Sequence, residues 1–299
     1  MSKKSLYLRF VWLGILQLVF INTALTSSNK PLHSKTSFGY RTPEPVNGET
    51  AVTARWIYGL SIGLYVPDNS TANYYNGSDE EHNLERALNL YYNRDRIVRE
   101  VDEIIESFEV YELPMAMQYN PAVQVGFYGG LVFNNAFAVT GEFNYTKLRV
   151  SDRFTLATDK ETFTTEPYLL LSDIFASEER IELRLGVQYT LQTSSYMHPF
   201  VESGINITDT KILENRVRVG GLNINIRDAR SDYYGIRDYG MGFGIFTAAG
   251  IKMDVTDTFS LRFGGSVSFS RINLGDNRNV RPQYTAFLRL DLNEVFASH

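Results

Sequence analysis

The stretch FSLRFGGSVSFSR, from Phe259 to Arg271, alternates strictly between two kinds of side chain. Its odd-numbered positions are mostly large and apolar, and its even-numbered positions are Ser, Gly and Arg262. A period of two predicts a β-strand with two different faces. In a soluble sheet the apolar face would point into a core. In a membrane barrel it would meet lipid, and the polar face would line the interior. One strand does not decide between these, so the rest of the chain must.

Seven further segments show the same alternation. They are 55–66, 119–133, 137–150, 180–192, 199–212, 238–254 and 282–293. Globular strands are usually about 5–6 residues long, whereas a tilted strand needs about 9–11 residues to cross a bilayer. The lengths of these segments therefore favour the membrane.

The connections between the predicted strands alternate between short and long. The short joins are 133–137, 193–199 and 255–259, and the long joins are 67–118, 151–179, 213–237 and 271–281. Transmembrane barrels show this asymmetry, with tight periplasmic turns and long outer loops. We therefore predict an all-β fold over residues 54–299, an eight-stranded antiparallel up-and-down transmembrane β-barrel whose apolar face meets outer-membrane lipid.

Composition excludes several classes of protein. The chain of 299 residues has no cysteine, so disulfides, thiolate metal sites and cysteine nucleophiles are excluded. A net charge of −5 gives no case for nucleic-acid binding. No apolar run outside the N-terminus reaches the 18 or so residues of a membrane-spanning helix. These features leave a barrel as the membrane option.

The N-terminus carries a predicted secretory signal peptide over residues 1–28. Three cations precede an apolar run from Phe10 to Ile21, and small residues follow it. This order is typical of a signal peptide; an N-terminal membrane anchor is the alternative. Residues 29–53 are polar and rich in Pro and Gly, which predicts a periplasmic linker. Together these segments predict export to the bacterial outer membrane.

The first long loop breaks the alternation. Over about 78–108, the apolar residues recur at a spacing of three and four, which predicts one helical face. That face includes Leu84, Leu88, Tyr91, Val98, Val101 and Ile105. Ser78 and Glu81 have the spacing of a capping box. We expect a helical insertion in the first external loop, whose apolar face either packs on the barrel rim or binds an envelope or surface protein.

The second and third predicted strands carry a resemblance. LPMAMQYNPAVQVGFYGGLVFNNAFAVTGEFNYTKLRVSDRFT, with the later IELRLGVQYTLQ and HPFVESGINI, resembles outer-membrane β-barrel proteins of Bacteroidota. The resemblance spans most of residues 55–293 and is broadly to PorT-like and small OmpA/OmpX-like eight-stranded barrels. It implies an outer-membrane barrel and supplies no catalytic motif.

Charged residues fall on the predicted inner face. Because an eight-stranded barrel encloses little more than its own side chains, buried charges inside it must pair. We predict a salt-bridged plug, with Arg55 and Lys252 also facing inward. The network consists of Glu142, Glu182, Arg184, Glu202, Arg262, Arg289 and Asp291. Strand direction places Glu182 and Arg184 nearer the outer rim, and Arg262 should meet Glu142, Glu202 or Asp291.

No catalytic, metal or cofactor site is predicted. Gly59–Gly63 matches the G-x-S-x-G nucleophile pattern but falls within a strand, whereas a true elbow needs a strand-to-helix turn. His82 is the one histidine near an acid or serine in an external loop. We predict a non-enzymatic barrel that presents external loops for binding or envelope organisation. The alternatives are a narrow pore or secretion accessory and, third, an outer-membrane enzyme.

Overall fold

The computed structural model describes residues 54–79, 82–101, 105–133, 136–160, 166–193, 196–226, 239–256, 258–274 and 279–293. The predicted signal peptide (1–28) and linker (29–53) lie outside the described residues.

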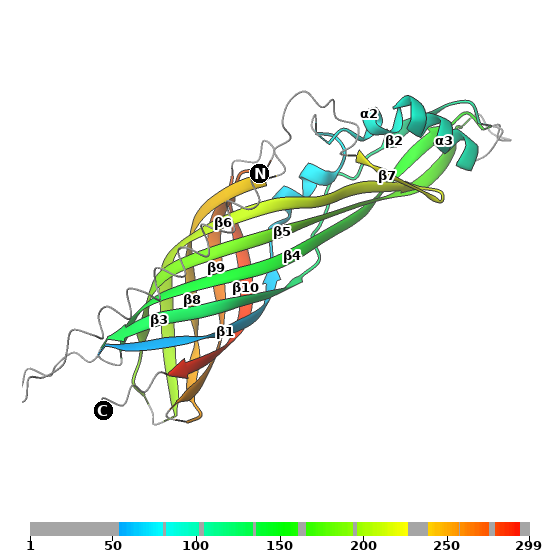
Figure 1. Ribbon diagram of the computed structural model, residues 1–299. Coiled ribbons are helices and arrows are strands. Elements are labelled where there is room, and N and C mark those ends of the chain that lie inside the picture. Colours follow the sequence, from blue (N-terminus) through cyan, green and yellow to red (C-terminus); the bar gives the residue numbers. More distant parts are fainter. Residues whose placement is uncertain are drawn as a thin grey trace, which may run out of the picture. The chain divides into compact units, whose positions relative to one another are not determined.

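Eight strands close into an antiparallel barrel (Figure 1). They are β1 (Arg55–Val66), β3 (Ala122–Phe133), β4 (Phe137–Thr158), β5 (Tyr168–Thr190), β6 (Met197–Val219), β8 (Tyr239–Asp254), β9 (Phe259–Ile272) and β10 (Val280–Asn293). Each strand pairs with its neighbours in the chain, and β1 pairs with both β3 and β10, which closes the barrel. The predicted eight-stranded antiparallel barrel is confirmed.

The alternation in sequence becomes a two-sided wall. On β9, Phe263 and Phe269 point outward and are exposed, whereas Ser266 and Ser268 are buried inside. The outward positions of the other strands carry Trp, Tyr, Phe, Leu, Ile and Val in the same way. This outward apolar band is the surface that a barrel presents to hydrocarbon. The opening stretch therefore has its apolar face outside and its serines inside.

Three strands continue beyond the band at the end of the barrel that carries the long connections. β4, β5 and β6 are each 22 or 23 residues long and outreach the other strands (Figure 1). β2 (Phe108–Glu112) adds to β4, and β7 (Leu222–Asn225) adds to β6. The result is a five-stranded external sheet in the order β2-β4-β5-β6-β7. Much of the joins 151–179 and 213–237, expected to be loops, is therefore strand.

Short helices cover one face of this external sheet. They are the 3-10 helix η1 (Asn69–Tyr75), α2 (Leu84–Leu88) and α3 (Tyr91–Val101). Asn83 caps α2, because its side chain accepts a hydrogen bond from the backbone N–H of Arg86 at 2.8 Å. The predicted capping box is wrong in its serine: Ser78 donates to Asn76 instead, and Glu81 lies outside the described residues. Among the described helices, none is long and apolar enough to cross a membrane.

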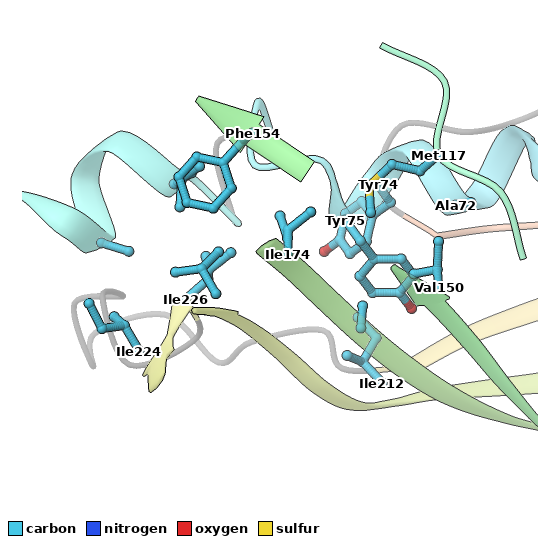
Figure 2. Packing of buried hydrophobic residues seen from close by; sticks show 14 of the residues in the cluster. Ala72, Tyr74, Tyr75, Met117, Val150, Phe154, Ile174, Ile212, Ile224 and Ile226 are labelled. Atoms are coloured by element: carbon cyan, nitrogen blue, oxygen red, sulfur yellow. The ribbon is translucent and has the colours of Figure 1, made fainter. Parts of the chain in front are cut away.

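The helices and the sheet share one hydrophobic core (Figure 2). Tyr75 from η1 and Leu88 from α2 are fully buried. They pack in a cluster with Phe154 of β4, Ile174 of β5 and Ile212 of β6. The part of the chain beyond the lipid band is therefore a small external domain with its own core, built on extensions of the barrel strands.

Candidate functional site

Arg289 lies at the centre of the barrel interior. Its guanidinium donates two hydrogen bonds to the carboxylate of Glu142, at 2.8 and 3.2 Å, and one to Glu202 at 2.7 Å. The guanidinium carbon lies 4.4 Å from the ring centre of Tyr128 and 4.2 Å from that of Phe287. One cation thus serves two carboxylates and is held between two aromatic rings, an arrangement that satisfies it without water.

A second arginine extends this cluster toward the outer end. Arg184 lies 2.8 Å from a carboxylate oxygen of Glu182 and 3.8 Å from one of Glu142. The guanidinium also lies 5.5 Å from the ring centre of Phe246. The sequence placed Glu182 and Arg184 nearer the outer rim than Glu142. The structure joins them into one network, because Arg184 contacts both carboxylates.

Arg262 completes the set on the side of the short turns. Its Nε forms an ion pair with Asp291 at 2.5 Å, and its Nη1 donates to Tyr128 and to Gln188 at 2.6 Å each. Among the three carboxylates that the sequence offered, Asp291 is its partner. Below this layer, Lys252 pairs with Asp254 at 2.7 Å.

All seven residues of the predicted network therefore face the interior and are buried. Arg184, Arg262 and Arg289 are among the largest side chains with less than 2% exposure. Three buried aromatic rings pack beside them: Phe246 on Arg184, Phe287 on Arg289, and Phe200 next to Phe287. Because an eight-stranded barrel is only just wide enough for its own side chains, this packing fills the middle of the barrel.

A further ion pair near the outer mouth was missed by the sequence reasoning. Arg180 and Glu178 form a fully buried pair at 2.6 Å. The Tyr75 hydroxyl, from η1, donates to Glu178 at 2.5 Å, and that of Tyr119 donates at 3.0 Å. Arg180 in turn donates to Tyr65, Thr71 and Gln283. The parity of the strand already placed Arg180 inside, but Glu178 fell in a segment expected to be a loop.

The external domain overturns one predicted contact surface. Leu84, Leu88 and Ile105 are buried in the shared core. Val98 and Val101 pack partly buried against it. The face predicted to bind a partner therefore covers the apolar side of the external sheet. Of that face only Tyr91, at 82% exposure, is on the surface.

Hydrogen bonds to the carboxylate of Asp159 hold the chain after Ile105 at the end of β4. Asp159 accepts a hydrogen bond from the hydroxyl of Ser107 at 2.9 Å and another from the backbone N–H of Glu106 at 3.1 Å. Hydrogen bonds from Ser107 and Glu106 stabilise the charged form and lower the pKa of the Asp159 carboxyl.

A cleft opens on the external domain between the η1–α2 connection and β2. Its volume is about 560 Å³, and it is lined partly by Asn83, Glu85 and Val110. Tyr111 and Met115, 60% and 87% exposed, lie at the same cleft. The concave surface combines apolar side chains with a few polar groups, as binding sites do.

The histidine considered for catalysis is part of the external core. His82 is fully buried, its Nδ1 lies 2.9 Å from the amide of Asn215, and its ring packs on Tyr74. Substrate could reach this ring only if the domain opened. Ser61, from the G-x-S-x-G match, lies within β1 and points into the barrel, so this segment forms no nucleophile elbow. The described residues contain no group of three or more histidine or acidic side chains placed to hold a metal ion.

No protein-family model matches this sequence. A search of curated proteins finds no match either. Solved structures of outer-membrane proteins align at 10% identity. Neisserial surface protein A covers 80% of this chain and 98% of its own, with a TM-score of 0.40. OprG from Pseudomonas aeruginosa covers 81% and 97%, with a TM-score of 0.41. The attachment invasion locus protein Ail of Yersinia pestis covers 81% and 97%, with a TM-score of 0.33.

Proposed function

We propose that this protein is a bacterial outer-membrane β-barrel whose filled interior anchors an external binding domain, and that it acts without catalysis. The outward apolar band and the sorting of short and long connections to opposite ends support the membrane setting. Residues 1–28 would direct its export. The patterns of glycine and aromatic residues support a likeness to PorT-like barrels of Bacteroidota.

The observation that carries this proposal is the continuity between barrel and external domain. β4, β5 and β6 run from the lipid band into the external sheet, and helices pack on that sheet around a common core. Inside the barrel, paired charges occupy the space that a pore would need. The barrel therefore serves as a rigid base, and the external domain presents the surface.

We place the binding surface at the cleft beside β2. Tyr111 and Met115 supply exposed apolar contact area there, and Asn83 and Glu85 supply polar groups. Aromatic residues and methionine are enriched in protein interfaces. The proposed partner is another protein of the cell envelope or surface. It would bind at this cleft and not at the helical face that the sequence suggested, because that face is buried.

Capture from native membranes tests this surface. A tagged protein with the changes Tyr111→Ser and Met115→Ser should lose its partner, while heat-dependent gel mobility shows that the barrel still folds. Tyr196→Ser is the control, because the exposure of Tyr196, at 73%, lies between those of Tyr111 and Met115, and Tyr196 is near the opposite end of the barrel. Capture that survives the double change would exclude the cleft as the binding surface.

Planar-bilayer recording tests the filled interior against the alternative of a narrow pore. The reconstituted protein should give no steady current, because the network around Arg289 leaves ions no hydrated route. A stable open-channel current from the unmodified protein would favour the pore and overturn the closed interior.

A further inference from the structure

Above the lipid band, the outward face of the external sheet carries many charged side chains beside the apolar Leu169, Leu171 and Phe175 of β5. On β4 the outward positions carry Lys147, Arg149 and Arg153, all exposed. Across the strands, Lys147 is in register with Glu179, and Arg153 with Asp173. This is the sheet face opposite the helices, and it continues the lipid-facing side of the barrel.

Cations of β6 already engage the carboxylates of this face. Lys211 lies 3.0 Å from Glu179. Arg216 lies 2.8 Å from Glu214, and Arg218 lies 2.6 Å from Asp173. Each of these carboxylates therefore has one close cationic partner on β6.

The cations of β4 are left in surplus. Within the described residues, Lys147 and Arg149 have no ion-pair partner, and Ser177 stands opposite Arg149 on β5. Arg153 lies 3.9 Å from an Asp173 that Arg218 already holds more closely, and its side chain is 70% exposed. β4 thus carries a basic stripe, on a chain whose net charge is −5.

The stripe begins at the level of the lipid headgroups. Tyr145 is the last large apolar outward residue of β4, and Lys147 and Arg149 follow two and four residues later. At a rise of about 3.4 Å per residue and a tilt of about 40°, they lie roughly 5 and 10 Å above Tyr145. The headgroup layer on each side of the hydrocarbon is about 5–8 Å thick, so Lys147 lies within the layer and Arg149 at its outer edge.

The opposite rim of the band differs in charge. Among the described residues near the short turns, the outward positions at the strand ends are Trp56, Phe137, Leu191, Met197, Phe259 and Leu292. These residues carry no charge. The surplus cations are therefore confined to the end that faces the outer leaflet in the proposed orientation.

We propose that Lys147 and Arg149 bind the phosphate groups of anionic lipid headgroups in the outer leaflet. This inference rests on the proposed membrane barrel. The Tyr145 hydroxyl donates to one oxygen of Glu179 at 3.3 Å, and Lys211 donates to the other at 3.0 Å, so both oxygens of this carboxylate already have a partner. The acid of β4 nearest to the two cations, Asp152, stands at an even position, which belongs to the opposite face of the strand.

Equilibrium titration of the folded, full-length protein with bisphosphorylated lipid A in neutral detergent tests this site. Basic residues near a membrane surface each contribute a factor of about five in affinity for anionic lipid. The double variant Lys147→Gln, Arg149→Gln should therefore bind about 25-fold more weakly. The exchange Lys147→Arg, Arg149→Lys should retain the affinity. The control Arg96→Gln, Arg99→Gln removes the same net charge from exposed positions of α3 and should leave it unchanged.

One further titration tests whether phosphate is the group that is recognised. Lipid A without its phosphates should bind the unmodified protein as weakly as the double variant binds the phosphorylated form. Equal weakening by the α3 control, or equal affinity for both lipids, would overturn the inference. Insertion into phosphatidylcholine vesicles is followed separately. A protein that inserts but shows no preference for phosphate contradicts this inference alone, and failure to insert contradicts the proposed membrane barrel.

Discussion

Replacing Arg289 with methionine should destabilise the barrel strongly. The change removes three hydrogen bonds, two to Glu142 and one to Glu202, and leaves both carboxylates buried. Breaking a buried ion pair by deleting one partner costs about 3–5 kcal/mol, because the remaining charge is no longer compensated. Thr140 still donates to Glu202 at 2.7 Å, and Arg184 remains 3.8 Å from Glu142, so the loss should not exceed this range.

The triple variant Arg289→Met, Glu142→Gln, Glu202→Gln isolates the charge effect. It removes the two orphaned carboxylates along with the guanidinium, and Arg184 keeps Glu182 at 2.8 Å. Replacing a whole buried charge cluster by neutral groups is often close to neutral for stability. The triple variant should therefore regain more than half of the free energy lost in the single variant.

Urea unfolding in lipid vesicles measures both variants. Trp56, on the outward face of β1, reports unfolding by fluorescence, and gel mobility without boiling reports the folded fraction. With a urea dependence of about 1–3 kcal/mol per molar, the single variant should lower the midpoint by about 1 M or more. Arg96→Met, on the surface of α3, is the matched control and should leave the midpoint in place. A triple variant less stable than the single one would refute the view that uncompensated charge dominates.

Two further changes test the mouth of the barrel and the close approach of its strands. Tyr75→Phe deletes the 2.5 Å hydrogen bond to the buried Glu178 and should cost about 1–3 kcal/mol of stability. Amide exchange should then become faster in η1 and stay unchanged in the barrel strands. If exchange in η1 stays as slow as in the unmodified protein, η1 does not depend on this bond. Gly63→Ala places a Cβ 2.7 Å from the carbonyl oxygen of Ala286 and should lower the folding yield in vesicles. The control Gly141→Ala should fold normally, because its Cβ meets only the end of a leucine side chain at 3.6 Å. Equal yields for the two variants would contradict the close approach of β1 and β10.

The membrane part of the fold was predictable because its alternation is unbroken. From Phe137 to Tyr145, the large apolar residues stand at odd positions and face outward, as predicted. The same parity placed Arg262 and Arg289 inside the barrel. A charge there has no access to water, so it must pair with an opposite charge. Which carboxylate each arginine meets depends on the stagger between strands, and the sequence left Asp291 as one of three candidates for Arg262.

The external domain was not predictable from the same rule, because the apolar residues change face. On β4 they stand at odd positions up to Tyr145 and at even positions from Leu148 to Leu156. A strand that leaves lipid for water must reverse its pattern, since its outer face becomes solvated and its inner face becomes a core. Read along the chain, that reversal resembles the end of a strand, and it made 151–179 look like a loop.

The sequence by itself determined the period of two, the count of eight membrane strands, the inward charges and the helical character of the first loop. These are local properties, set by which side chain follows which. Only the tertiary structure decided what the helical face covers, which carboxylate each arginine binds, and that β6 rather than β4 neutralises the acids of the external sheet. Those outcomes depend on contacts between residues far apart in the chain, and the pairing register of the closed barrel fixes them.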